Sequence, residues 1–95
     1  MTSSDMLELL KVDLGISGTS AYDNRLMSYI QAAQKGIEIE GVTLNLNDVG
    51  DAQLTIMYAA WQWRKRDTME GMPRMLRFAL NNRIFSEKMR GDNNG

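Results

Sequence analysis

The chain contains no cysteine and no histidine, and each absence excludes a kind of chemistry. Without cysteine there is no disulfide and no thiolate ligand for a metal. Without histidine, the commonest general base, zinc ligand and pH switch is missing. Carboxylates or lysine could still act in catalysis, but the sequence contains no recognisable nucleophile–base pair, phosphate-binding glycine loop or EF-hand loop. We therefore expect no enzymatic activity, no bound metal and no cofactor.

Long apolar runs are also absent, and the first residues are polar and acidic, unlike a secretory signal. A length of 95 residues predicts a single domain over residues 1–95. The lack of cysteine fits a reducing compartment. We expect a soluble intracellular protein, neither secreted nor inserted in a membrane. Its folded core should span about residues 5–85, with a flexible tail over 86–95.

Charge of one sign dominates each half of the chain, although the net charge is only −1. Residues 1–51 carry eight acidic and three basic side chains, a net charge of −5. Residues 52–95 carry four acidic and eight basic side chains, a net charge of +4. Such asymmetry favours head-to-tail stacking of copies or contact with an acidic partner. Alternatively, the charges intermix on the surface once the halves fold together.

Apolar residues recur at three- and four-residue spacing in four segments, which predicts four helices. The expected ranges are about 5–14, 21–35 or 21–39, 48 or 51 to 66, and 73 to 81 or 82. Ser4 or Asp5 would cap the first helix, and Asp5 with Glu8 has the spacing of a capping box. Gly15 would end that helix, and Pro73 would occupy the first position of the last helix.

The predicted fold is therefore an all-α, compact four-helix domain. The stretch from Ile37 to Val42 alternates apolar and acidic residues, so a short strand or hairpin there competes with extension of the second helix. Arg83 to Phe85 could form another short extended segment. The third helix is the most apolar, so we expect it to be central. The predicted core residues are Leu10, Leu26, Ile30, Leu54, Met57, Tyr58, Trp61 and Leu76.

Both tryptophans and three consecutive bases lie together between Trp61 and Arg66. Two residues apart on a helix, Trp61 and Trp63 point roughly 200° from each other. We assign Trp61 to the core, whereas Trp63 either meets the fourth helix or anchors an interface, as tryptophan and arginine often do. The helix dipole alone would also explain cations at this helix end. The predicted interaction surface consists of Trp63, Arg64, Lys65, Arg66, Arg74 and Arg77.

Four stretches follow one another in a recognisable order. They are LLKVDLGI (Leu9 to Ile16), DNRLMSYIQAA (Asp23 to Ala33), YAAWQWR (Tyr58 to Arg64) and MPRMLR (Met72 to Arg77). Over roughly residues 5–85, this order resembles the small helical head–tail connector proteins of long-tailed phages and prophages, also called head-completion or DNA-packaging proteins. The order and spacing carry the resemblance, because each stretch alone is a general helical pattern. The family pattern falls on Leu26, Ile30, Ala33, Trp61, Trp63 and Pro73.

The resemblance implies a structural role in the virion rather than catalysis. Such proteins assemble as a ring of about a dozen copies below the portal protein, extend the DNA channel, and offer a surface to the next tail-side component. DNA would pass through the ring without sequence-specific contacts. The protein would reside in the host cytoplasm during assembly and then at the head–tail junction of the virion. The alternative is a small nucleic-acid-binding module that uses Trp61 to Arg66 with Arg74 and Arg77.

Overall fold

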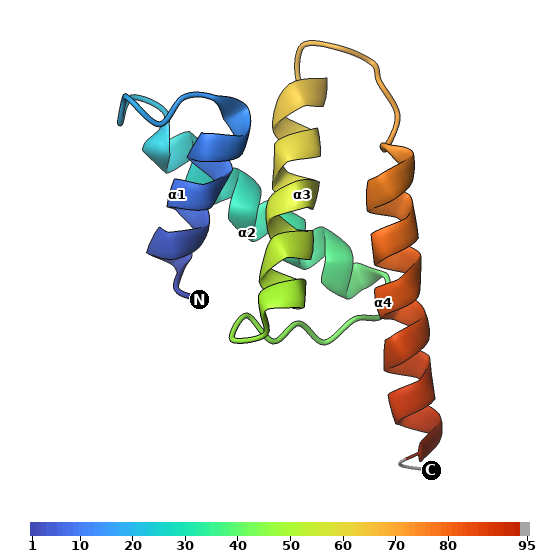
Figure 1. Cartoon of the computed structure of the whole chain (residues 1–95). Helices are drawn as coiled ribbons and strands as arrows, with labels where there is room; N and C mark the ends of the chain where they lie inside the picture. Colours follow the sequence, from blue (N-terminus) through green and yellow to red (C-terminus); the bar gives the residue numbers. More distant parts are fainter. Residues whose placement is uncertain (94–95) are drawn as a thin grey trace.

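The computed structural model describes residues 1–93, with side-chain surroundings through Arg90. Its four helices are α1 (Ser3–Leu14), α2 (Asp23–Ile39), α3 (Val49–Lys65) and α4 (Arg74–Asn93), and the described residues contain no strand. Helix α3 stands between α1 and α4, while α2 crosses behind it (Figure 1). The predicted all-α, compact four-helix fold is confirmed.

Helix α1 begins with a capping box that uses other residues than we predicted. Thr2 is the N-cap, and its hydroxyl accepts a hydrogen bond from the backbone N–H of Asp5 at 3.1 Å. The Asp5 carboxylate in turn accepts one from the backbone N–H of Thr2 at 3.1 Å. The box therefore lies three residues N-terminal to the predicted Asp5–Glu8 pair. At the other end, Gly15 adopts the left-handed conformation (φ 73°) and ends the helix as predicted.

Helix α2 continues through Ile39, so the predicted alternative of a strand from Ile37 to Val42 is wrong. Ile37 is fully buried and extends the inward row of Leu26, Ile30 and Ala33 at helical spacing. This burial favours the helix over the alternating pattern that the sequence also permits. Gly41, with φ 102°, stands in the turn that follows the helix.

Helix α3 is the central element, as its apolar composition predicted. Ala52, Ile56 and Ala59 pack into a core cluster shared with α1 and α2, whereas Leu54 packs into a second cluster shared with α4. Its N-cap is Asp48, whose carboxylate accepts a hydrogen bond from the backbone N–H of Gly50 at 2.7 Å. The helix therefore connects two small cores, neither of which would suffice alone.

Helix α4 is longer than predicted. We expected it to end at Asn81 or Asn82, but it continues to Asn93. The predicted extended segment from Arg83 to Phe85 is wrong, because those residues form helical turns in which Ile84 packs against the second core cluster. Residues 86–93 of the predicted tail are helical, whereas their flexibility stays a prediction; 94–95 lie outside the described residues.

Within the described residues, none of the helices combines the length and apolar content that a bilayer crossing requires. The approach of α2 to α3 is close at Gly36, where an added Cβ would lie 2.7 Å from the hydroxyl oxygen of Tyr58. Gly36 therefore serves packing, and does not end the helix as a breaker would.

Candidate interaction surfaces

The structure buries Trp63, which we predicted at an interface, more deeply than Trp61, which we predicted in the core. Trp63 is buried in the first core cluster, with only 7% of its surface exposed. Its ring meets Tyr22 and Tyr29 edge-on, at centroid distances of 5.6 and 5.5 Å. The assignment of Trp63 as an exposed interface anchor is thus corrected, since its ring supports α2 against α3.

Trp61 is only partly buried and packs against the second core cluster. Its ring meets Tyr58 edge-on at 5.5 Å, and its indole N–H donates to the backbone carbonyl of Gly71 at 3.1 Å. Trp61 therefore holds the α3–α4 loop to the end of α3. The sequence could establish that the two rings point apart, but not which direction leads into the core.

The basic cluster at the end of α3 is largely engaged within the molecule. The guanidinium of Arg66 lies 3.8 Å from the Trp63 ring centroid, and the ammonium of Lys65 lies 4.4 Å from that of Trp61. Arg66 also donates to the backbone carbonyl of Trp63 at 2.6 Å, at the helix end where cations are stabilised. Two of the three bases therefore stack on the two tryptophans of the same chain.

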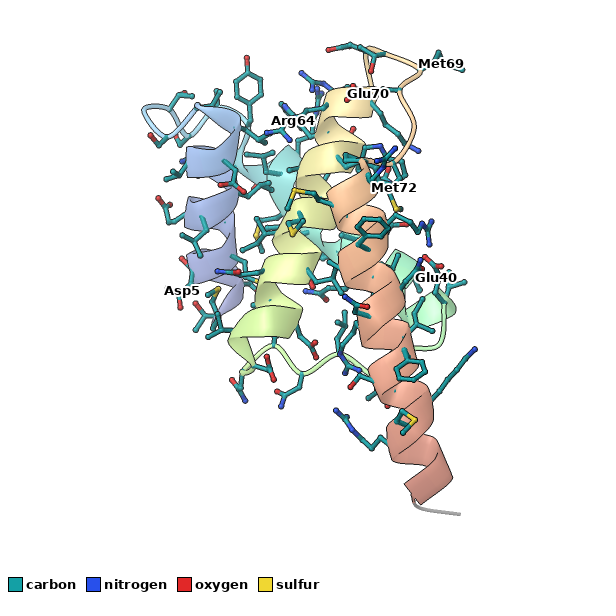
Figure 2. The ribbon with its side chains drawn as sticks, turned by 45° about the vertical axis from the view of Figure 1, so that its right-hand side comes forward. Asp5, Glu40, Arg64, Met69, Glu70 and Met72 are labelled. Atoms are coloured by element: carbon teal, nitrogen blue, oxygen red, sulfur yellow. The ribbon has the colours of Figure 1, made fainter. Side chains whose placement is uncertain are left out.

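The remaining predicted interface arginines do not form one patch with that cluster. Arg64 is exposed and donates to the backbone carbonyl of Asp13 at 3.3 Å, which ties α3 to the end of α1. Arg77 lies 3.4 Å from the Glu40 carboxylate, at the far end of α2. Arg74 is exposed on the first turn of α4. Figure 2 shows Arg64 and Glu40 at different heights of the molecule, so the six residues divide between separate surfaces.

All eight predicted core residues pack inside the domain, but to different depths. Leu10, Leu26, Ile30, Leu54 and Leu76 are buried. Met57, Tyr58 and Trp61 are partly buried and pack against the core clusters. The spacing of apolar residues along α3 places these three on the correct side of the helix, yet the edge of the small domain leaves each of them partly exposed.

A polar contact that the sequence did not reveal joins α3, α4 and the loop before α3. Arg83 donates from Nε to Asp51 Oδ1 at 2.7 Å and from Nη2 to the backbone carbonyl of Thr43 at 2.9 Å. Glu87 accepts from the backbone N–H of Thr43. We call Thr43, Asp51, Arg83 and Glu87 the Arg83 clasp. Burial raises the pKa of Asp51, but hydrogen bonds from Arg83 and from the Asn45 backbone outweigh burial, so that pKa lies below its ordinary value.

The Arg83 clasp lies in a groove of about 500 Å³ between α3 and α4. Its polar lining includes Asn45, Asp48, Asn82, Arg83 and Arg90. Arg83 uses Nε and Nη2 for Asp51 and Thr43, whereas its buried Nη1 has no hydrogen-bond partner among the described residues and lies 3.6 Å from the Glu87 carboxylate. The described part of the chain also has no cluster of three acidic side chains placed to hold a metal ion.

Helix α4 carries a row of exposed apolar side chains. Met75, Phe78, Phe85 and Met89 are 76%, 58%, 65% and 48% exposed. Together with Asn82 they recur at steps of three and four residues, so they share one side of the helix. We call these five residues the α4 outer face. Its spacing could be read from the sequence, but the predicted helix end at Asn81 or Asn82 concealed it.

Comparisons with protein-family models, with curated protein sequences and with solved structures return no match to this chain. The resemblance to head–tail connector proteins therefore rests on the order of the sequence features quoted above.

Proposed function

We propose that this protein is a structural assembly subunit, a phage head–tail connector protein that forms a ring below the portal and extends the DNA channel towards the tail. The observation that carries the proposal is the α4 outer face. Its four large side chains are each about half exposed or more. Monomeric proteins rarely expose a contiguous apolar row of this kind, whereas interaction surfaces commonly do.

The apolar character of both sides of α4 supports the same role. Leu76 and Leu80 are buried on the inner side of the helix. The four large side chains of the α4 outer face are also apolar, but they are exposed to solvent. Burial of the outer side chains against a partner would contribute roughly 25 cal/mol per Å² of apolar surface. A helix that is apolar on both sides is typical of an element placed between its own domain and a neighbour.

The proposed partners are other copies of this chain, the portal protein, and the next tail-side component, with DNA passing through the channel without specific contacts. Assembly would take place in the host cytoplasm, and the finished ring would belong to the virion.

A nucleic-acid-binding module based on Trp61 to Arg66 with Arg74 and Arg77 is less well supported. Trp63 is buried, and Lys65 and Arg66 already stack on tryptophan rings. Stacking of bases requires exposed aromatic faces. A binding assay with duplex and single-stranded DNA separates the two proposals, since the alternative requires affinity that falls steeply with salt.

The direct experiment adds purified protein to DNA-filled, portal-bearing capsids of the phage or prophage that encodes it. We expect electron microscopy to reveal a new ring of density below the portal. The matched control is a chain with Ala32→Glu on the exposed side of α2, which should also add density. If the protein is folded by circular dichroism and adds no density, the connector proposal is wrong.

A further inference from the structure

The α4 outer face has basic edges. At about 100° per residue, this face lies on the side of the helix opposite the buried Leu80. The exposed charged side chains beside this row, over residues 74–90, are all basic: Arg74, Lys88 and Arg90. Glu87, the acidic residue of this stretch, turns inward to the Arg83 clasp and also lies 3.8 Å from Arg90, so Arg74 and Lys88 are the bases of this edge without a carboxylate partner among the ion pairs of the described residues. A partner for this face should therefore combine apolar side chains with acidic ones.

Helix α1 presents such a surface. Leu9 and Val12 are 41% and 63% exposed. Asp5, Glu8 and Asp13 are exposed around them. The one base of the helix, Lys11, is instead buried, and its ammonium lies 3.0 Å from the Asp23 carboxylate. We call Asp5, Glu8, Leu9, Val12 and Asp13 the α1 outer face.

A shallow recess adjoins the α1 outer face. It measures about 250 Å³ and lies between α1 and α3. Leu9, Asp13, Gln53, Ile56 and Met57 line it. The recess therefore combines three apolar side chains with the polar Asp13 and Gln53. An aromatic side chain from a neighbouring molecule has a concave, partly apolar place to pack there.

The two outer faces cannot meet within one chain. Helices α1 and α4 occupy opposite edges of the domain, with α3 between them in both views (Figures 1 and 2). In two neighbouring copies they can meet, and the pair then keeps one free α1 outer face on one copy and one free α4 outer face on the other. Such a head-to-tail contact repeats, and it produces a closed ring when the rotation between copies allows closure.

We propose that the α4 outer face of one copy packs on the α1 outer face of the next. This inference rests on the proposed assembly function and identifies the partner of the exposed apolar row as a second copy of this chain. Charge complementarity favours it, because three exposed acids face three exposed bases. Pairing two α4 outer faces would instead bring Arg74, Lys88 and Arg90 near their own copies, where like charges repel.

A single contact of this kind is small. Stable interfaces bury about 800 Å² per partner, and two phenylalanines, two methionines, a leucine and a valine supply only part of that area. Individual contacts should therefore be weak, while ring closure makes them collectively strong.

The decisive experiment uses two variants that each block one face. Phe85→Glu places a carboxylate within the α4 outer face, and Val12→Lys places a cation within the α1 outer face. Both positions are exposed, so both variants should keep the wild-type melting temperature. By sedimentation velocity at up to about 1 mM, wild type should associate with concentration and each variant alone should stay monomeric. An equimolar mixture should form a dimer and nothing larger, because one intact face remains on each partner.

Three results would overturn this assignment. The first is wild type that stays monomeric at about 1 mM. The second is Val12→Lys protein that associates like wild type, as expected if α4 pairs with α4. The third is a mixture that stays monomeric while wild type associates. Gln31→Lys and Ala32→Glu, on the exposed side of α2, are the matched controls and should associate like wild type.

The capsid experiment separates this inference from the proposed function. If both face variants still add a ring below the portal, the connector function stands and the α1–α4 contact is wrong. If wild type adds no density but the mixture of variants dimerises, the contact stands and the connector function is wrong.

Discussion

At the scale of single residues, the tryptophans carry most of the packing at the end of α3. Trp63 fills the space between two tyrosines of the α2 region, and Arg66 covers its outer side. Trp61 holds the backbone of Gly71 with its indole N–H. One ring therefore stabilises the helix packing and the other stabilises a loop, although they are two residues apart.

Replacing Trp63 by alanine should destabilise the isolated domain strongly. Truncation of a buried tryptophan costs about 3–5 kcal/mol, a large part of the total free energy of unfolding of a small domain. Trp61→Ala, at a partly exposed position, should cost about 1–2 kcal/mol. Urea denaturation followed by circular dichroism measures both. Equal losses for the two variants would contradict the different burial of the two rings.

At the scale of elements, the Arg83 clasp connects the second half of α4 to the domain. The clasp joins Asp51 on the first turn of α3, Arg83 on α4 and Thr43 in the loop before α3. The side chains of Arg83 and Asp51 are 13% and 7% exposed, so the pair is shielded from water. Through Glu87, which accepts from the backbone N–H of Thr43 and lies 3.6 Å from Arg83, the clasp also holds α4 beyond Ile84.

Asp51→Asn should destabilise the protein at neutral pH by about 3 kcal/mol, because the shielded Arg83 would lose the carboxylate that it contacts at 2.7 Å and keep only Glu87 at 3.6 Å. The pKa of Asp51 is lower in the folded state than its ordinary value of 3.8. Its stabilising contribution is therefore fully present above 3.8 and is lost as the pH falls through the lower folded pKa. Urea midpoints should differ most between wild type and variant at pH 7 and converge in strong acid.

The exposed Asp13 supplies the control for this pH series. Asp13→Asn should change the free energy of unfolding at pH 7 by less than about 0.5 kcal/mol. A difference between wild type and Asp51→Asn that stays constant from pH 7 into strong acid would show that the carboxylate charge is not what the clasp uses.

At the scale of the whole molecule, the sequence asymmetry of charge survives folding only in part. Arg77 with Glu40, and Arg83 with Asp51, pair bases of the second half with acids of the first. The α1 outer face nevertheless stays acidic and the edges of the α4 outer face stay basic. The ion pairs within the molecule thus combine charges of both halves, while its two opposite edges carry opposite charge.

This edge-to-edge polarity predicts that self-association weakens with salt. Raising the ionic strength from about 0.1 M to about 1 M shortens the screening length from about 10 Å to about 3 Å. We expect the apparent association constant to fall roughly fivefold, which corresponds to about 1 kcal/mol for exposed charges. Sedimentation equilibrium of wild type at both salt concentrations measures this change. Association that strengthens with salt would indicate a contact based on apolar burial alone.

Much of the architecture could be predicted because it depends on local patterns. The rows of apolar residues at helical spacing predict four helices, and Gly15 ends α1 where expected. The end of α4 was mispredicted because Asn81 and Asn82 resemble a helix stop, whereas Arg83 and Ile84 gain partners on other elements that keep the helix going. Such long-range partners leave no mark in the local sequence.

The sequence by itself thus determined the helix number, the inward rows and the unequal charge of the two halves, because periodicity and composition are properties of neighbouring residues. Only the tertiary structure decided that Trp63 rather than Trp61 is buried, that Arg83 joins Asp51, and that the α1 and α4 outer faces lie on opposite edges. The physical reason is that each of these depends on how helices distant in sequence pack together, and packing selects one of several faces that the local pattern permits.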